Sequence, residues 1–538
     1  MHRTVRCASL ILALTLLFAG EAPASRGSNA PSRGTDADDY WHYTSVGNLG
    51  LSITNFGILG HGWNRPDNPS CMYKIRTNVL QEQVEHFSYA GVWVGGIRQG
   101  VEHVSTGIMD GVFGYEDGGW EFTTSAQEQV PYNPIFVHLN KIDRRYDFSR
   151  AEADGIVTFG GALNGQIENG YIDFGSTSWD TMITASSIRD ASVNNPYADY
   201  AQFFDPNAIS HQDLVCSFTD TNDVVPGTGV SIPNHEPLGV HVYQEAYAWY
   251  EPFADAFNIL NYTVTNIPTG WFIADEDTVM TYDTGMEVEY AAGDTVWLGT
   301  VLEAPTFGLW VDASVGNMHY TPDSNYDPNG GPGGRWYWYD NLNAWDAQRR
   351  LGISFDYDGD AGWAQSYLGV KVLGGSPVEE NDSLHTNYRQ WTWQGNTFPS
   401  DFPMPENESE RYRYMFTPGN VPYTGEEYQQ SWMMMISAGP FPDMAPGQRF
   451  NIAMAVVCGL WNGSGDDLTD SNGDGIPDRR EYLYKNAEWA QIAYNGEDRN
   501  GNNILDPGED LDGDGIIDRY ILPSSPPSPA LVVVPGNH

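Results

Sequence analysis

Short runs in which apolar and polar residues alternate recur along most of the chain, and glycines and prolines separate them. Alternation with a period of two is typical of strands with one buried face, and helical periodicity is rare here. Strands at this spacing without intervening helices predict a mostly β fold, built from one or more antiparallel β-sandwich domains. The runs that fit best are 91–97, 214–218, 240–250, 257–264, 295–302, 368–372, 432–436 and 450–460.

The organisation of the β-rich region, residues 41–462, follows from its length and its loops. Single cores stop growing near roughly 250 to 300 residues, so we expect two sandwiches. A boundary is predicted near 221–239, a loop dense in Gly, Pro, Asn and Asp. The last two runs, 432–436 and 450–460, are joined by a proline-rich connection, and we expect them to pair as a hairpin.

The N-terminal segment has the features of an export signal. Arg3 and Arg6 precede an apolar run over 8–20, and Ala22 and Ala24 then offer a small-residue cleavage site. The sequence therefore predicts a cleaved signal peptide over 1–24, followed by a disordered linker over 25–40. This run is shorter than the roughly 18 residues of a spanning helix, and no later run reaches that length. We expect an extracellular or cell-surface protein with no membrane span.

The net charge of the chain limits the classes of partner that it can bind. The chain carries 71 acidic against 26 basic residues, a formal net charge of −45. Nucleic acid and anionic lipid are polyanions, so such a chain repels them. So many carboxylates can instead hold cations.

The strongest motif is a twelve-residue loop whose oxygen-bearing residues stand where calcium loops place their ligands. Gly475 occupies the position of the sharp turn, and Ile476 would donate its backbone carbonyl. The ligands predicted for this first loop are Asp470, Asn472, Asp474, Ile476, Asp478 and Glu481.

Two more loops of this kind follow. The second has Asn503 in place of the turn glycine, and asparagine tolerates the left-handed conformation. The third has Ile521 at its twelfth position, so it needs Glu509 or a water to complete its ligands. The predicted ligands are Asp498, Asn500, Asn502, Ile504, Asp506 and Glu509 for the second loop, and Asp510, Asp512, Asp514, Ile516 and Asp518 for the third.

The segment between the first two loops has apolar residues at helical spacing, so residues 466–521 are predicted to be a module of calcium loops and a helix. We expect the module to dock on the β-region through Trp461 and the apolar helix face around Leu483. A flexible tether at 463–465 is the alternative.

Three cysteines follow the predicted signal peptide. Cys216 and Cys458 each continue an alternating apolar series, so both are predicted to be buried in strands. An odd number cannot form a closed set of disulfides, and a bridge between Cys216 and Cys458 stays open.

The tandem loops resemble those of dockerins and thrombospondin type 3 repeats. The stretches 89–96, 235–239, 437–447 and 455–459 resemble a group of uncharacterised secreted bacterial surface proteins. Such proteins usually continue into a fibronectin type III domain and a C-terminal sorting signal. The resemblance implies that 522–538 is a proline-rich linker and the start of a truncated fibronectin-like domain.

No nucleophile elbow, phosphate-binding glycine loop or zinc-protease spacing occurs in the sequence. Pro237 prevents a helix that would bring His235 and His241 together, so we expect a turn there that leads into a strand. The aromatic run 336–339, with Asp340 and Trp345, is either a sugar-stacking platform or sheet core.

We therefore expect a secreted calcium-binding structural or adhesive protein, with surface polysaccharide or other extracellular proteins as partners. A carbohydrate-binding module and a polysaccharide-acting enzyme are the alternatives, since glycoside hydrolysis needs only two suitably placed carboxylates.

Overall fold

The chain divides into two compact units, residues 1–490 and 491–538. The predicted signal peptide, the linker 25–40, the aromatic run 336–339 with Asp340, Asp512 and the segment 523–538 lie outside the described residues. The computed structural model describes residues 41–44, 46–60, 69–74, 83–108, 121–122, 136–139, 209–221, 232, 235–317, 341–359, 362–377, 384–392, 402–419, 432–463, 467–511 and 513–522.

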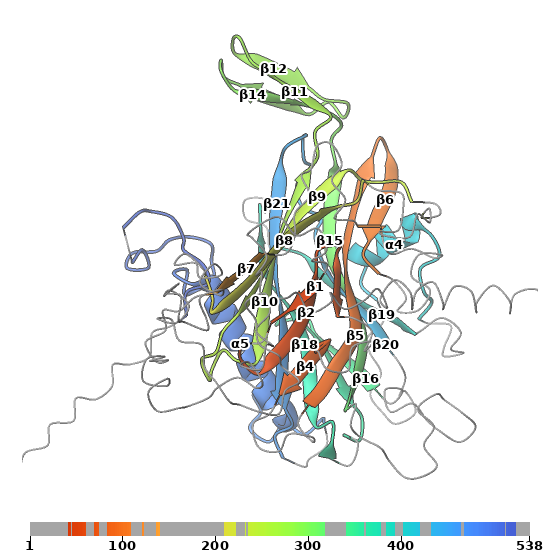
Figure 1. Cartoon of the computed structure of the whole chain (residues 1–538), viewed down its shortest axis with the longest axis vertical. Helices are drawn as coiled ribbons and strands as arrows, with labels where there is room; N and C mark the ends of the chain where they lie inside the picture. Colours follow the sequence, from red (N-terminus) through yellow and green to blue (C-terminus); the bar gives the residue numbers. More distant parts are fainter. Residues whose placement is uncertain are drawn as a thin grey trace, which may run out of the picture. The chain divides into compact units, whose positions relative to one another are not determined.

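The first unit contains two large antiparallel sheets (Figure 1). The nine-stranded sheet has the order β1-β2-β3-β5-β15-β20-β19, with β4 beside β2 and β5, and β6 beside β5. Its strands are β1 (Trp41–Tyr43), β2 (Leu49–Thr54), β3 (Ile58–Gly60), β4 (Cys71–Lys74), β5 (Gln83–Arg98), β6 (Val101–Thr106), β15 (Glu303–Asn317), β19 (Thr386–Thr392) and β20 (Trp432–Ala438).

The eight-stranded sheet has the order β16-β17-β18-β21-β10-β9-β8-β7. Its strands are β7 (Phe136–Leu139), β8 (Gln212–Thr219), β9 (Val240–Ala248), β10 (Phe257–Asn266), β16 (Asn341–Asp346), β17 (Leu351–Asp356), β18 (Ser366–Ser376) and β21 (Arg449–Leu460). The predicted mostly β fold is confirmed.

One apolar core lies between the two sheets. On β21 the residues that face it alternate with the strand period, Phe450, Ile452, Met454, Val456 and Cys458, as the sequence predicts. Leu49, Leu51 and Ile53 of β2 belong to the same core from the opposite sheet. The strands on either side of the predicted boundary at 221–239, β8 and β9, are neighbours in one sheet. The described strands thus build one sandwich where two were predicted.

The predicted hairpin of 432–436 and 450–460 is wrong. β20 pairs with β15 and β19 in the nine-stranded sheet. β21 pairs with β10 and β18 in the other sheet. The connection over 439–448 therefore crosses from one sheet to the other. The two strands lie on opposite sides of the same core, and each buries an apolar face in it.

The outer face of the nine-stranded sheet is also buried, under helix α4 (Glu408–Phe416). Tyr412 and Met415 of the helix pack on Trp93, Trp310 and other residues of the sheet. The helix begins at Asn407, whose side chain accepts a hydrogen bond from the backbone N–H of Glu410. This packing fixes the first turn of α4 beside the edge strand β6.

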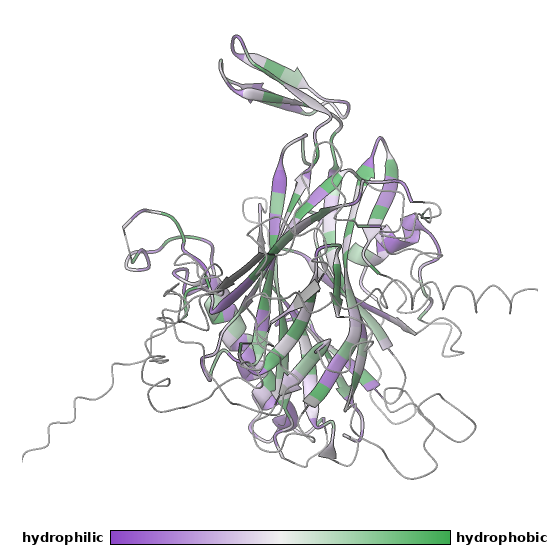
Figure 2. Ribbon diagram, viewed as in Figure 1, coloured by the Kyte–Doolittle hydropathy of each residue, from purple (hydrophilic) through white to green (hydrophobic). Residues whose placement is uncertain are grey.

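Four short strands form an arm between β10 and β15, which extends away from the large sheets (Figure 1). β11 (Gly270–Ile273) pairs with β14 (Thr295–Leu298), and β12 (Thr278–Thr281) pairs with β13 (Glu287–Tyr290). Apolar and polar residues alternate along it (Figure 2). The predicted strand 295–302 therefore ends early, at Leu298.

The C-terminal part contains the short helix η5 (Asp478–Arg480) and helix α5 (Glu481–Asn495). The predicted helix between the first two loops is confirmed. In the part of the chain that the structure describes, no helix is both long and apolar enough to cross a membrane.

Candidate functional site

Hydrogen bonds from backbone N–H groups to side chains of the same loop hold the conformation of the first predicted calcium loop. Both carboxylate oxygens of Asp470 accept backbone N–H groups, from Gly473 at 2.7 Å and from Gly475 at 2.9 Å. The Asp474 carboxylate accepts the N–H of Ile476 at 2.8 Å. Gly475 has a φ of +81°, so the predicted sharp turn is present.

The two final ligands of this loop lie at its junction with helix α5. Hydrogen bonds from the hydroxyl and the backbone N–H of Ser471 lower the pKa of Asp478. Glu481, the first residue of α5, accepts a hydrogen bond from the Asn462 side chain at 2.7 Å. The loop is thus held to the chain that precedes it.

The end of the loop and the start of α5 are buried against the eight-stranded sheet. Arg480 forms a salt bridge with Asp467, and the Tyr367 hydroxyl donates to the same carboxylate at 2.5 Å. Leu483 lies so close to Gly459 of β21 that a Cβ on this glycine would come within 2.3 Å of the Leu483 backbone nitrogen.

Trp461 completes this contact, because the Arg479 guanidinium lies 3.3 Å from the centre of its ring. Trp461 and Leu483 therefore hold the first loop and the start of α5 on the sheet, and docking of the whole module stays a prediction.

The second and third loops lie in the second unit. Asn503 has a φ of +61°, which confirms that asparagine takes the place of the turn glycine in the second loop. The Asp498 carboxylate accepts the N–H groups of Asn502 at 3.0 Å and Asn503 at 2.9 Å. In the third loop, the Asp510 carboxylate accepts the N–H of Gly513 at 2.6 Å.

A carboxylate that the sequence did not single out, Glu497, joins these two loops. It is 1% exposed and accepts the backbone N–H groups of Leu511 at 2.7 Å and Asp518 at 3.1 Å. The oxygens of Glu509 accept the N–H groups of Arg499 and Asp506, both at 3.0 Å. Glu509 therefore contacts the second loop, and Glu497 contacts the third.

The donor set fits calcium in kind, because the predicted ligands are carboxylate, side-chain amide and backbone carbonyl oxygens, the ligand atoms of hard cations. It does not form a finished shell. Among the described residues, no three His, Cys, Asp or Glu side chains converge on a common point. The carboxylates that would bind the ion accept backbone hydrogen bonds instead.

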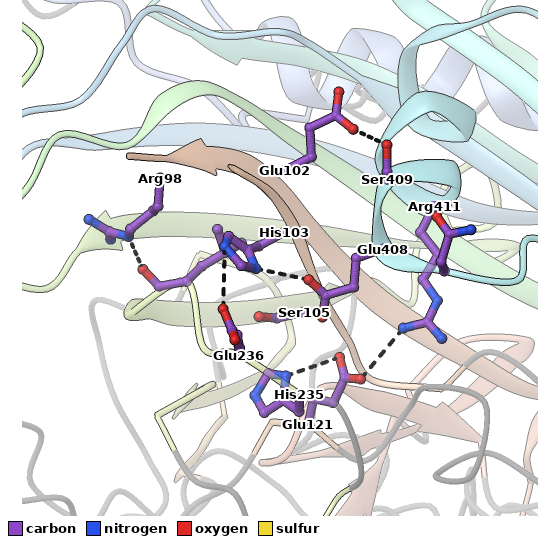
Figure 3. Close-up of polar contacts among 12 residues, drawn as sticks. Arg98, Glu102, His103, Ser105, Glu121, His235, Glu236, Glu408, Ser409 and Arg411 are labelled. Carbon is purple, nitrogen blue, oxygen red and sulfur yellow. Dashed lines mark hydrogen bonds and ion pairs between the residues drawn. The ribbon is translucent and has the colours of Figure 1, made fainter. Parts of the chain in front are cut away.

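A second site combines histidines and carboxylates from four separate segments (Figure 3). His103 of β6 contacts Glu408 in the first turn of α4, with Nδ1 at 2.9 Å from the carboxylate. Its Nε2 lies 3.8 Å from the carboxylate of Glu236. The Glu408 side chain is 20% exposed and that of Glu236 is 80% exposed, so this group of three reaches the surface.

Behind this group lies a fully enclosed acid, Glu121. Its carboxylate accepts the N–H of Thr106 at 2.5 Å and the Thr106 hydroxyl at 3.0 Å. Arg411 of α4 and His235 lie at 3.8 Å and 3.7 Å from its oxygens. His235 also contacts the Asp220 carbonyl at 3.0 Å, and the strand predicted to follow it is present as β9.

The surroundings of Glu408 shift the acidity of its carboxyl. Burial raises its pKa, the hydrogen bond with His103 lowers it by less, and the negative charge of Glu121 raises it further. A carboxyl in contact with an imidazole is a pair of groups that can donate and accept protons. The site can therefore perform acid–base chemistry on a molecule that reaches Glu236 and Glu408, and it can equally hold α4 on β6.

Sequence reasoning did not find His103, Glu121 or Glu408, because they lie far apart in the chain and share no motif. The structure also places His235 and Glu236, from the segment before β9, beside these three. Of the predicted aromatic platform, Trp345 is described, and it stacks on Tyr388 with ring centres 5.3 Å apart. It packs against the sandwich core, so this residue serves the sheet.

Comparison with known proteins adds little to this geometry. No family model matches the chain, and no curated protein matches it. Among solved structures, it is similar to the crystal structure of heparan sulfate lyase HepC from Pedobacter heparinus, with 9% sequence identity and a TM-score of 0.17. The alignment covers 47% of this chain and 21% of that chain. A likeness this slight carries no argument about activity.

Proposed function

We propose that this protein is an exported, calcium-binding structural or adhesive protein of the bacterial cell surface or extracellular matrix. The observation that supports it most is the junction between the first loop and the sandwich. Asp478 and Glu481 would bind the ion, and Arg480, between them, is buried in a salt bridge with Asp467. Calcium at this loop would therefore brace a helix that covers the sheet.

The physical reason is the charge on the loop. Asp470 and Asp474 are exposed and carry like charges in one short turn. Close pairs of like charges cost on the order of 1 kcal/mol at intermediate dielectric, and a bound cation removes this cost. A millimolar exterior keeps such sites filled when they bind near roughly 10⁻⁵ M.

The exposed apolar surface of the arm supports the adhesive part of the proposal. Its exposed apolar side chains are Trp271, Phe272, Ile273, Val279 and Leu298, with Trp271 62% exposed. No Lys, Arg or His occurs between residues 267 and 302. Exposed aromatic and aliphatic groups are typical of surfaces that bind partners. Surface polysaccharide and other extracellular proteins are the partner classes that this surface suits.

Calcium titration combined with thermal unfolding of the full chain tests the proposal. We expect heat of binding and an increase in the free energy of unfolding of about 2.7 kcal/mol for a site filled at one hundred times its dissociation constant. The double variant Asp474→Ala with Glu481→Ala should lose this increase for the first loop. Glu276→Ala with Glu287→Ala removes the same charge from the exposed arm and should keep it. Unfolding of the parent chain that ignores both calcium and chelator would refute the proposal.

A polysaccharide-acting enzyme is the second candidate, and the contact between His103 and Glu408 favours it. Incubation with a panel of acidic and neutral polysaccharides, followed by measurement of new reducing ends, tests it. Glu408→Gln should abolish any turnover, and Glu410→Gln, on the same helix, should leave it unchanged. Binding without turnover that Trp271→Ala weakens would favour a carbohydrate-binding module instead.

A further inference from the structure

Two of the three cysteines in the described chain meet across the sandwich. Cys71 lies on β4 of the nine-stranded sheet, and Cys458 lies on β21 of the eight-stranded sheet. Both side chains are fully buried, and the two thiol groups are hydrogen-bonded to each other. The contact therefore joins the two sheets through the core between them.

The surroundings of this pair come from both sheets as well. His86 of β5 contacts the Ser366 hydroxyl of β18 at 2.8 Å. Its other ring nitrogen lies 3.4 Å from the carbonyl of Cys71. Because β18 is the neighbour of β21, with Leu368 opposite Cys458, the imidazole fixes the spacing between the sheets at this point.

The two thiols differ in acidity. Burial acts to raise the pKa of Cys458, but the hydrogen bond from Cys71 and the charge of His86 outweigh burial and lower it. Burial raises the pKa of Cys71 well above its ordinary value. In the folded core, Cys71 is therefore the donor and the Cys458 sulfur the acceptor of the hydrogen bond between them. Two cysteine side chains in contact are what a disulfide requires.

We propose that Cys71 and Cys458 form a disulfide that links the two sheets in the mature protein. The inference rests on the proposed export, because disulfides persist in oxidising compartments. The third cysteine, Cys216, is placed differently, with its thiol donating to the Thr54 carbonyl at 3.4 Å. The bridge between Cys216 and Cys458 that the sequence left open is thus replaced by one from Cys71.

The reaction needs an oxidant, which is a disulfide donor such as an exported dithiol oxidase or oxidised glutathione. One of the two cysteines attacks the donor disulfide as its thiolate, forms a mixed disulfide and releases one donor thiolate. The thiol of the other cysteine then loses its proton and attacks the sulfur of the first, which releases the second donor thiol. Two protein thiols are oxidised and one donor disulfide is reduced, and both steps take place before the sheets close over the pair.

Peptide mapping under non-reducing conditions tests the pairing. The full chain is refolded with oxidised glutathione, and a second sample is recovered from outside the cell after export. Both are alkylated in denaturant, digested and analysed by mass spectrometry. We expect a linked pair of peptides that contains Cys71 and Cys458, and an alkylated Cys216. Separate alkylated peptides for Cys71 and Cys458 in the refolded sample would overturn the proposal, as would Cys216 as the partner.

Thermal unfolding supplies a second measurement. Reduction should lower the melting temperature of the oxidised chain by about 5 °C. Cys71→Ala and Cys458→Ala should each remove this sensitivity to reductant, and Cys216→Ala should keep it. A link present after refolding with glutathione, together with no protein recovered outside the cell, would support the pairing and count against export. The two proposals can therefore fail separately.

Discussion

The sandwich core and the acidic loop over 470–478 belong to the same unit, and opposite kinds of chemistry hold them. In the core, β21 places Ile452, Met454 and Val456 among apolar neighbours, away from water. In the loop, Asp470 and Asp474 are exposed and accept hydrogen bonds from backbone N–H groups of the loop and from the Asn472 side chain. Burial of apolar surface can therefore drive folding of the first, whereas the second gains most from a cation that removes charge repulsion.

The largest expected effect comes from the second buried apolar cluster, between the nine-stranded sheet and α4. Trp93 is fully buried, packs against Trp391 with ring centres 6.0 Å apart, and donates a hydrogen bond to the Ile108 carbonyl at 2.8 Å. We expect Trp93→Ala to lower the free energy of unfolding by about 4 kcal/mol, because it leaves a cavity. Denaturant unfolding at zero and at millimolar calcium measures this loss, which should be the same in both.

Trp271→Ala is the matched control. This tryptophan lies on the arm and is 62% exposed, so its removal should change stability by no more than about 0.5 kcal/mol. A loss from Trp93→Ala that calcium restores would break the distinction between core and loop.

The junction between core and loop should respond almost as strongly. Asp467→Ala leaves the Arg480 guanidinium buried without its carboxylate and removes the acceptor of the Tyr367 hydroxyl. Removing one partner of a buried pair typically costs about 3 kcal/mol or slightly more. Denaturant unfolding measures the loss, and calcium binding by the first loop should weaken with it.

The double variant Asp467→Ala with Arg480→Leu should recover part of that stability, because no charge is then left uncompensated. A double variant less stable than Asp467→Ala alone would mean that the ion pair itself, rather than the buried charge, decides the energy.

The strands could be predicted from the sequence, and their neighbours could not. The alternation from Phe450 to Cys458 predicts a strand with one buried face, and β21 confirms it. The same alternation carries no information about which strands pair with β21. The hairpin prediction failed because a connection of the same length can join two strands in one sheet or cross between two sheets.

The candidate sites show the same limit of prediction from a single sequence. Loop ligands such as Asp470 and Asp474 are close in the sequence, so their spacing alone predicts them. His103 and Glu408 meet only because α4 packs on the sheet, and Cys71 meets Cys458 only because the sheets face each other. Contacts that depend on tertiary packing leave no periodic signal in one sequence.

A pH effect should distinguish the core from the loop. Burial raises the pKa of Glu85 to about 7, although hydrogen bonds from the backbone of Ser70 and Cys71 oppose the shift. The folded state then holds a proton that the unfolded state loses near pH 4.5, so the stability gained at low pH is lost as pH rises through about 7. The expected loss between pH 5 and pH 7.5 is about 2 kcal/mol.

Unfolding of Glu85→Gln over the same pH range isolates this group, because the variant cannot titrate there. The parent should lose more stability than the variant as pH rises. The exposed loop acid Asp478 has a lowered pKa, so it is ionised throughout this range and Asp478→Asn should follow the parent's slope. Parallel curves for the parent and Glu85→Gln would show that Glu85 is ionised in the folded core at pH 5.

The smallest expected effect lies in the backbone of the second loop, where geometry rather than charge is at stake. Asn503 has a φ of +61°. This conformation costs most residues with a Cβ about 1 kcal/mol, whereas asparagine tolerates it and glycine, which has no Cβ, adopts it freely. Asn503→Ala should therefore weaken calcium binding by the second loop about fivefold, as measured by calorimetric titration of the full chain. Asn503→Gly also loses the hydrogen bond that Arg519 donates to the Asn503 side chain at 2.8 Å, but it relieves the strain and should bind nearly as the parent does. Equal weakening in the alanine and glycine variants would assign the effect to the Arg519 contact, and the loop would then depend on a side-chain partner as the core does.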